Sequence, residues 1–356
     1  MPEVIVVGAG LAGLTASIQC ARAGHEVRVL ERFNRVGGAH GHHPSVDSTP
    51  LLPERMGKLL GFELKPPQVT PTSLLRSFVY GRDYVMDGKR QSLQAVERGS
   101  RSTSLENYLF RIAQDAGVKF DFGWTLRTQN DVAELPPGSI VATGLHYEPY
   151  QALGIPWQDV YGFVANGRFE GPPMAVVWFD TFAGDYSYFA NLNGIGFALA
   201  FDRKPLPRIA QERFVRRLYQ DLGVEFEGWH SFEGAVGVKR LDNPRLFSGP
   251  LILAGSLAGM QDPFFFFGVH ASLISGSIAA MAVDDKAAAW ERFRRISALY
   301  KYSFVGRRLF EPLPHPVRKP LLCAFMKMQV RWPDRFGGLT LNAIPGFKEL
   351  ERSSLT

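Results

Sequence analysis

The stretch Val-Ile-Val-Val-Gly-Ala-Gly-Leu-Ala-Gly, residues 4–13, decides the fold expected for this chain. Its first four residues are apolar and β-branched, which is typical of a buried parallel strand. A helix-forming run from Leu14 to Ala23 follows, and Gly24 ends it. Residues 25–30 form a second strand. This order of strand, glycine turn, helix and strand predicts a parallel α/β unit.

The three glycines have the Gly-x-Gly-x-x-Gly spacing of a dinucleotide-binding turn. Gly8 allows the tight turn, Gly10 lets the backbone approach a pyrophosphate, and Gly13 lets helix pack on strand. The pyrophosphate then rests on free N–H groups at the helix N-terminus. Glu31 ends the second strand, 23 residues after Gly8, and is placed to accept hydrogen bonds from ribose hydroxyls. The sequence therefore predicts a dinucleotide site.

A second glycine pair follows in Glu-Arg-Phe-Asn-Arg-Val-Gly-Gly, residues 31–38. This Arg-x-Gly-Gly segment resembles the extended nucleotide fingerprint of flavoproteins of the glutathione-reductase type, in which it lies along FAD. Two adjacent glycines give a backbone with exposed amides and no side-chain wall, which suits a large flat cofactor. An ordinary flexible loop is the alternative. The resemblance favours FAD over NAD.

Three histidines follow the glycine pair, at positions 40, 42 and 43. In the resembling flavoproteins this segment passes the isoalloxazine, so His42 and His43 are candidates for flavin or substrate contact or for proton supply. Polar loop residues without chemistry are the alternative of greater weight. A covalent histidyl–flavin link is rarer, and no Cys or acid at ligand spacing supports a metal site. We take His42 and His43 as catalytic candidates and expect no metal.

Composition and charge bound the class of protein. The 356 residues are 46% hydrophobic and 21% charged, which is ordinary for a globular protein of two domains or one elaborated domain. No apolar run reaches the roughly 18–20 residues that span a bilayer, and the N-terminus reads as a strand rather than a signal peptide. The two cysteines form no disulfide framework, which favours a reducing, cytoplasmic setting.

The net charge of +6 is concentrated near the C-terminus. Residues 290–335 contain eleven Lys and Arg against three Asp and Glu, a local net charge of +8. Such a region suits anionic lipid or an acidic protein partner. Nucleic acid is not expected, because no recognised binding motif accompanies the charge.

Further strands and a helix are expected between the nucleotide turn and residue 144. Residues 77–81 and 84–88 look like two strands. Ser104 caps a helix that Gly117 ends, and a strand follows at 118–122. Residues 139–144 form a strand that ends in Ala-Thr-Gly. This ending resembles the segment in which FAD proteins return past the adenosine, and a plain core strand is the alternative of equal weight.

A second, sheet-rich region is expected between residues 155 and 240. Residues 173–180, 187–191 and 195–201 look like strands, and a helix is expected from 206 to 222. An antiparallel sheet inserted here would roof a substrate pocket, and its aromatic side chains would line it. A plain sheet core is the equally weighted alternative. The aromatic residues concerned are Trp178, Phe179, Tyr186, Tyr188 and Phe189.

The stretch from residue 250 to 282 carries a second resemblance. A buried strand at 250–256 is followed by Asp262-Pro263, four phenylalanines at 264–267, Gly268 and a small-residue helix. It resembles the second FAD motif of the geranylgeranyl-reductase and para-hydroxybenzoate-hydroxylase group. There an acid binds the ribityl chain, and the helix N-terminus faces the flavin's pyrimidine end. Two departures stand out: Ser256 replaces the group's Asp, and the phenylalanines replace a glycine-rich turn.

The C-terminal region is expected to be helical and basic. A helix is predicted over 287–302, and a basic amphipathic helix begins at Pro320. This second helix either caps the domain with its apolar face, which has the greater weight, or lies on an anionic membrane surface.

Together these features predict an α/β protein: a Rossmann-like FAD-binding domain, an inserted antiparallel-sheet substrate domain and a helical C-terminal region. The expected domains are FAD-binding at 1–75, 100–150 and 235–285, substrate-binding at 76–99 and 151–234, and helical at 286–356. The cofactor-binding residues expected are Gly8, Gly10, Leu11, Ala12, Gly13, Glu31, Arg32, Arg35, Gly37, Gly38, Ala39, Thr143, Gly144, Gly255, Ser256, Asp262, Gly268 and Val269. The substrate residues expected are Trp178, Tyr188, Phe265 and Phe266.

The function expected is that of an FAD-dependent oxidoreductase. Hydride transfer through flavin N5 to or from an apolar, isoprenoid-like or aromatic substrate is favoured. A flavin monooxygenase and a non-catalytic scaffold or electron-transfer partner are the alternatives. No second Gly-x-Gly-x-x-Gly unit is present, so electrons are expected from transient NAD(P)H, an electron-carrier protein or the substrate. Peripheral membrane contact is the other partner expectation.

Overall fold

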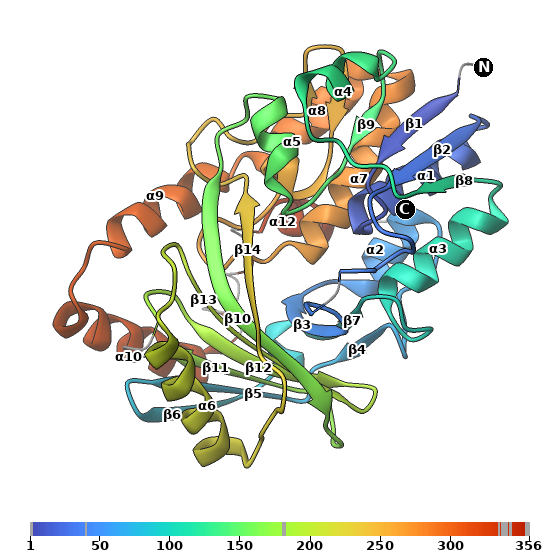
Figure 1. The fold of residues 1–356 in the computed structure, drawn as a ribbon. Helices are drawn as coiled ribbons and strands as arrows, with labels where there is room; N and C mark the ends of the chain where they lie inside the picture. The colour runs from blue at the N-terminus through green and yellow to red at the C-terminus, as the bar shows by residue number, and fades with distance from the viewer. Residues whose placement is uncertain are drawn as a thin grey trace.

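The nucleotide-binding stretch joins the first strand of a mainly parallel sheet to the first helix (Figure 1). The structure is a computed structural model that describes residues 3–39, 41–179, 183–333, 335, 341 and 344–352. The sheet has the order β15-β16-β9-β1-β2-β8. Its strands are β1 (Val4–Val7), β2 (Val27–Glu31), β8 (Lys119–Phe122), β9 (Ile140–Val141), β15 (Phe247–Ser248) and β16 (Leu251–Leu253). Pairing is parallel except between β15 and β16. This Rossmann-like arrangement confirms the predicted fold class.

Helices cover this first sheet. The long helices are α1 (Leu11–Arg22), α3 (Leu105–Asp115) and α7 (Val269–Asp284). Ser104 caps α3 as predicted, because its Oγ accepts a hydrogen bond from the Asn107 N–H at 3.2 Å. The shorter helices around this layer are α2 (Pro53–Leu60), α4 (Gln129–Glu134), α5 (Tyr147–Ala152) and η2 (Gly255–Ala258).

A second sheet faces the first across the molecule (Figure 1). It has the order β14-β10-β13-β12-β11-β5-β6. Its strands are β5 (Leu74–Val79), β6 (Arg82–Asp87), β10 (Gln158–Arg168), β11 (Met174–Phe179), β12 (Ser187–Leu192), β13 (Ile195–Asp202) and β14 (His230–Val236). All pairs are antiparallel except β11 with β5. Helix α6 (Arg208–Leu222) covers the outer face through an apolar cluster that includes Trp178 and Phe214.

A small third sheet lies between the two large ones. Strands β3 (Ser45–Pro50), β4 (Val69–Pro71) and β7 (Leu93–Arg98) have the order β3-β7-β4, and η1 (Lys89–Gln91) precedes β7. Val46 and Ala95 pack against Ala190 and Phe197 of the second sheet. Sequence analysis did not predict these strands, because residues 44–104 show no long periodicity.

The C-terminal region differs from the expectation in two places. The helix expected over 287–302 is two helices, α8 (Lys286–Ser297) and α9 (Tyr300–Phe310). The helix expected from Pro320 starts earlier, as α10 (His315–Arg331), and Pro320 lies inside it. Helix α12 (Phe347–Arg352) packs near α2 and α8. The outer helices α9 and α10 lie beside the second sheet, away from the nucleotide sheet (Figure 1).

We predict that Gly8→Ala destabilises the fold. Gly8 has φ +101°, and a Cβ there would lie 2.5 Å from the Ala142 carbonyl oxygen. Backbone strain and overpacking each cost about 1–3 kcal/mol. The free energy of unfolding, measured in urea on protein stripped of FAD, should fall by about that much.

Gly10→Ala is the matched control for this prediction. Gly10 is extended, with φ −82° and ψ −176°, and a Cβ there meets no atom of the described residues within 4 Å. Its free energy of unfolding should stay within about 0.5 kcal/mol of wild type. Equal unfolding midpoints for the two variants would contradict this account of the turn.

Candidate functional site

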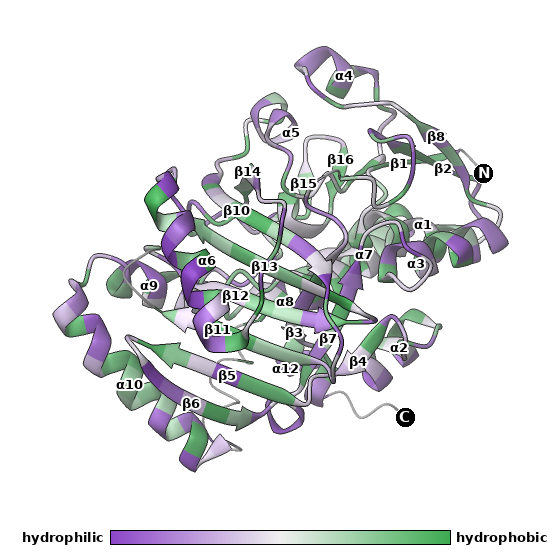
Figure 2. Cartoon of the chain, turned by 60° about the horizontal axis from the view of Figure 1, so that its bottom comes forward, coloured by the Kyte–Doolittle hydropathy of each residue, from purple (hydrophilic) through white to green (hydrophobic). Residues whose placement is uncertain are grey.

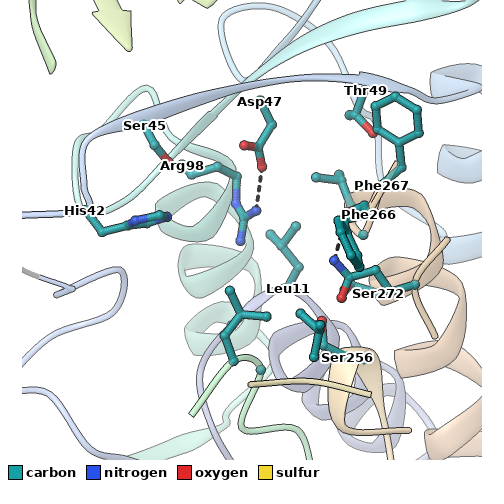
Figure 3. A pocket seen from close by; sticks show the side chains of 18 of the residues that line it. Leu11, His42, Ser45, Asp47, Thr49, Arg98, Ser256, Phe266, Phe267 and Ser272 are labelled. Carbon is teal, nitrogen blue, oxygen red and sulfur yellow. Dashed lines mark hydrogen bonds and ion pairs between the residues drawn. The ribbon is translucent and has the colours of Figure 1, made fainter. Parts of the chain in front are cut away.

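One large cavity lies between the nucleotide sheet and the second sheet. Its volume is about 1030 Å³. One wall is formed by the glycine turn and the N-termini of α1 and α7, and the other by β3 and the inner face of the second sheet. Figure 3 shows Leu11 and Ser256 opposite Asp47 and Thr49. The cavity exceeds the roughly 300–1,000 Å³ of a typical single-ligand pocket.

The glycine turn forms an open cradle at one end of this cavity. Gly8, Gly10, Leu11 and Ala12 line it, and a Cβ at Gly10 would project into space that the described residues leave free. No side chain caps the N-terminus of α1, so its first N–H groups are available to an anion. Gly13 does not line the cavity. It packs against the backbone of the turn, since a Cβ at Gly13 would lie 1.9 Å from the Gly8 carbonyl oxygen. The cradle fits a pyrophosphate.

Glu31 lies beside the cradle. Its carboxylate accepts hydrogen bonds from the N–H groups of Ala9 at 2.7 Å and Phe33 at 3.0 Å. Each oxygen therefore keeps a lone pair for a ribose hydroxyl. Arg32 also lines the cavity, with its guanidinium 4.3 Å from the centre of the Phe33 ring. Arg35 is exposed and does not line the cavity.

The end of β9 supplies a polar atom that suits a ligand. Thr143 and Gly144 line the cavity. Within the described part of the chain, Thr143 Oγ1 is buried without a hydrogen-bond partner, and such an atom in a native fold calls for a ligand or water. Sequence analysis missed the neighbouring wall from Trp124 to Leu126. This segment could have been found from its position directly after the strand β8. In the structure it lies beside the end of β2, where the Trp124 N–H donates to the Glu31 carbonyl at 3.1 Å.

The Gly37-Gly38 pair serves the protein's own packing as well as the cavity. Both glycines and Ala39 line the cavity. A Cβ at Gly37 would lie 2.2 Å from the carbonyl carbon of Gly99, and one at Gly38 would lie 2.9 Å from the Phe33 Cβ. The pair therefore keeps the loop close to the chain behind it.

The second motif brings the N-terminus of α7 to the cavity. Gly255, Ser256, Gly268 and Val269 line it, and no side chain caps α7. A helix N-terminus favours negative charge within about one turn. Two helix N-termini, those of α1 and α7, therefore point into the same cavity.

The structure corrects the expectation for Asp262. This carboxylate is buried away from the cavity, where it accepts hydrogen bonds from Ser303 Oγ at 2.5 Å and from the Phe265 N–H at 2.6 Å. Burial raises its pKa above the usual range. Asp262 joins the phenylalanine loop (residues 264–267) to α9, because one oxygen binds the Phe265 N–H and the other binds Ser303.

The phenylalanine loop forms one side of the cavity without filling it. Phe265, Phe266 and Phe267 line it, whereas Phe264 packs on Phe310 with ring centres 5.5 Å apart. Phe266 has φ +60°, a conformation that costs a non-glycine residue about 1–3 kcal/mol. The Gln261 side-chain amide holds its carbonyl at 2.8 Å.

His42 and His43 both line the cavity and are half-buried. Their ring centres are 5.1 Å apart, and His43 Nδ1 lies 3.0 Å from Ser45 Oγ. Burial is the main cause that lowers the pKa of both imidazoles, so the neutral form is favoured near pH 7. His40 lies outside the described residues.

The inner face of the second sheet forms the far wall. Tyr188 lines it, and its hydroxyl donates to Asp47 Oδ1 at 3.3 Å. The expectation for Trp178 is wrong, because alternate residues of a strand point to opposite faces. Three residues of β11 face the cavity: Ala175, Val177 and Phe179. The Trp178 side chain points the other way, and its indole N–H donates to Asp221 of α6 at 2.7 Å.

Sequence analysis also missed a polar cluster on this wall. Arg98 on β7 lies between two carboxylates, with Nη1 2.9 Å from Asp47 and Nε 2.6 Å from Glu106. All three residues line the cavity, and Figure 3 shows Arg98 beside Asp47. Only Asp47 had a signal in the sequence, because it alternates with Ser45 and the buried Thr49 on one face of β3.

Helix α10 closes the cavity at its far end. Phe325, Met326 and Gln329 of α10 line it, and Met326 also packs on Met86 of β6. Sequence analysis placed no site residue here.

We predict that Gly10→Ala weakens FAD binding while the fold stays intact. The added methyl occupies the cradle where the pyrophosphate must approach the backbone. Retention of FAD, measured by the absorbance that survives gel filtration, should fall at least tenfold. Gly306→Ala is the control, because a Cβ there also meets no described atom within 4 Å and lies on α9. Equal retention of FAD by both variants would show that FAD does not bind at this turn.

We predict that His42 contributes to acid lability. Its folded-state pKa lies below the unfolded value of about 6.5, so the stability that it contributes is present above pH 6.5 and is lost as the pH falls toward the folded pKa. The free energy of unfolding should decline less steeply below pH 6.5 in His42→Gln, by up to about 1.4 kcal/mol per pH unit. An unchanged slope in the His42→Gln variant would contradict this prediction.

Comparison with known proteins agrees with this geometry. Residues 3–48 match the family described as FAD dependent oxidoreductase. Flavin-containing monooxygenase FMO GS-OX2 of Arabidopsis thaliana is 50% identical over 49 residues, which are 14% of this chain and 11% of that protein. 4,4'-Diaponeurosporene oxygenase of Staphylococcus aureus is 32% identical over 86 residues, 24% of this chain and 15% of that protein. The matches thus span only about a tenth to a seventh of the relatives.

Solved structures match almost the whole chain at low identity. A geranylgeranyl bacteriochlorophyll reductase-like protein from Thermoplasma acidophilum has a TM-score of 0.70 and 14% identity over 98% of both chains. p-Nitrophenol 4-monooxygenase PnpA from Pseudomonas putida has a TM-score of 0.67 and 12% identity over 100% of both. A variant of Klebsiella pneumoniae HpxO, complexed with FAD, has a TM-score of 0.66 and 15% identity over 97% of this chain and 98% of that one. Residues 3–48 therefore resemble the FAD-dependent oxidoreductases, and the chain has the fold shared by this geranylgeranyl bacteriochlorophyll reductase-like protein, PnpA and HpxO.

Proposed function

We propose that this protein is an FAD-dependent oxidoreductase that transfers a hydride between flavin N5 and an apolar substrate, with reduction of an isoprenoid-type double bond as the favoured reaction. The observation that carries the proposal is the single cavity of about 1030 Å³. It is lined at one end by a dinucleotide turn and at the other by an apolar sheet face. A cofactor and a substrate therefore share one cavity.

The residues near the two helix N-termini fit FAD. The Gly10 cradle receives the pyrophosphate, Glu31 receives the ribose, and Thr143 Oγ1 gains a partner. The ribityl contact falls to Ser256 or nearby backbone amides, because Asp262 is turned away. Bound here, FAD supplies two-electron chemistry. The N-terminus of α7 contributes a fixed positive field at its pyrimidine end.

The far wall fits an apolar substrate. Its side chains are mostly aliphatic or aromatic, and each apolar group removed from water favours binding. These side chains are Leu75, Met86, Ala175, Val177, Phe179, Leu199, Phe201, Phe325 and Met326.

Reduction of a double bond needs a proton as well as a hydride. Tyr188 is the candidate donor on this wall by position, because it lines the cavity. Its hydroxyl proton is directed at Asp47 and must turn to the substrate for transfer. Burial raises its pKa well above the usual value, which weakens it as an acid. His42 and His43, neutral near pH 7, favour positioning over acid catalysis.

Two other functions remain as candidates. A flavin monooxygenase is favoured by the likeness in fold to p-nitrophenol 4-monooxygenase, which covers all of both chains. A scaffold without substrate chemistry was suggested by the phenylalanine run. The volume left beside Phe265, Phe266 and Phe267 weighs against the scaffold.

We predict that the purified protein is yellow and stays so through gel filtration. Anaerobic NADPH, or a chemical reductant such as dithionite if a carrier protein is the donor, should bleach the flavin band. With an isoprenoid alkene present the band should recover without oxygen. Oxygen uptake coupled to NADPH consumption and substrate hydroxylation would instead identify the monooxygenase. A colourless protein that cannot be reconstituted with FAD would refute both.

A further inference from the structure

Helices α9 and α10 carry exposed apolar stripes. On α9, Tyr302, Val305 and Leu309 are 65%, 48% and 69% exposed. On α10, Val317 and Leu321 are 43% and 50% exposed. The spacings of three, four and four residues place each stripe on one side of its helix. We call these five residues the α9–α10 stripe. Side chains of this size are rarely gathered on a surface without a partner.

Basic side chains flank the stripe, and acids do not. The exposed flanking residues are Lys301, Arg308, Lys327 and Arg331. Between residues 300 and 333 the sequence contains one acid, Glu311. Glu311 is already paired with Arg203 at 2.7 Å. The field over this surface is therefore positive.

The opposite sides of both helices are fixed to the protein. On α9, Ser303 donates to Asp262, and Arg307 donates to the Phe264 carbonyl at 3.1 Å. On α10, Leu322 and Met326 pack against β5 and β6. The stripe is thus the outward side of two anchored helices, and Figure 2 shows α9 and α10 together at one edge of the molecule.

We propose that the α9–α10 stripe docks the protein on the surface of an anionic lipid bilayer. Apolar side chains enter the interface while the flanking Lys and Arg meet lipid phosphates, and stable peripheral binding needs both contributions. In the part of the chain that the structure describes, no helix is long and apolar enough to cross a membrane. The docked protein therefore lies on one leaflet.

The inner side of α10 faces the cavity. Phe325 and Met326 line it, while Val317 and Leu321 of the same helix face outward. One helix thus separates the docking surface from the cavity. Resting on the proposed function, this arrangement suits a lipid-like substrate drawn from the bilayer.

Helix α6 offers an internal control. It is also exposed and basic, and Ile209 and Tyr219 are 52% and 60% exposed. Its charge is mixed, because Glu212 and Asp221 pair with Arg208 and Arg217. If any exposed arginine-rich helix bound vesicles nonspecifically, α6 would contribute to binding as much as α9 and α10.

The test is co-sedimentation of the full-length protein with phosphatidylcholine vesicles, with or without 30% phosphatidylglycerol. We expect binding to the anionic vesicles only, weakened by salt. Lys301→Gln with Lys327→Gln should reduce the partition coefficient about 25-fold, on the order of fivefold per charge. Leu309→Gln with Leu321→Gln should reduce it at least tenfold. Arg213→Gln with Arg216→Gln, and Ile209→Gln with Tyr219→Gln, should leave it unchanged.

Three outcomes would overturn the proposal. The first is no binding to either vesicle, and the second is equal loss in the α6 variants. The third is concentration-dependent dimerisation in sedimentation velocity that the Leu309 and Leu321 variant abolishes, which would make a second copy the occupant. Circular dichroism and unfolding midpoints show whether each variant is folded. The assay uses neither flavin nor turnover, so its result is independent of the proposed reaction.

Discussion

The close approach of α1, β9 and α7 around the glycine turn is the constraint on which the site depends. Gly8 leaves no room for a Cβ against Ala142, and Gly276 of α7 leaves none against the Ala12 carbonyl, which a Cβ would approach to 2.4 Å. Backbones at this distance place two helix N-termini near the ends of β1 and β16, the two strands that flank β9. That place, outside the carboxyl ends of the strands, is where open α/β sheets bind ligands.

A second constraint connects this site to the C-terminal helices. Arg307 of α9 is buried, pairs with Asp185 and donates to the Phe264 carbonyl. Asp262 joins the same loop to Ser303. A buried pair adds little net stability, but loss of one partner leaves an uncompensated charge that costs about 3–5 kcal/mol. The phenylalanine loop, the second sheet and α9 are therefore held in one arrangement, and a movement of α9 must also displace the cavity wall.

The nucleotide end was predictable from sequence because its signals are local. The backbone geometry of the turn requires glycine at these positions, and Glu31 can be identified from its distance along the chain from them. The far end was not predictable in the same way. Trp178 and Phe179 are both aromatic strand residues, and only the register of β11 decides that Phe179 faces the cavity while Trp178 lies beneath α6. Arg98 and Asp47 meet through pairing of β3 with β7, which no sequence period announces.

Asp262 resembles part of a family motif in sequence but has a different role in the structure. Asp262 follows the strand of the second motif and was expected among the cofactor-binding residues, yet its carboxylate binds Ser303 and the Phe265 N–H. The four phenylalanines replace glycines that would otherwise form this turn, and Phe266 adopts φ +60° to follow it. A bulky turn in such a conformation needs external anchors, and Asp262, Gln261 and Arg307 provide them. Asp262 thus holds an apolar wall of the cavity in place, which is consistent with the apolar substrate that we propose.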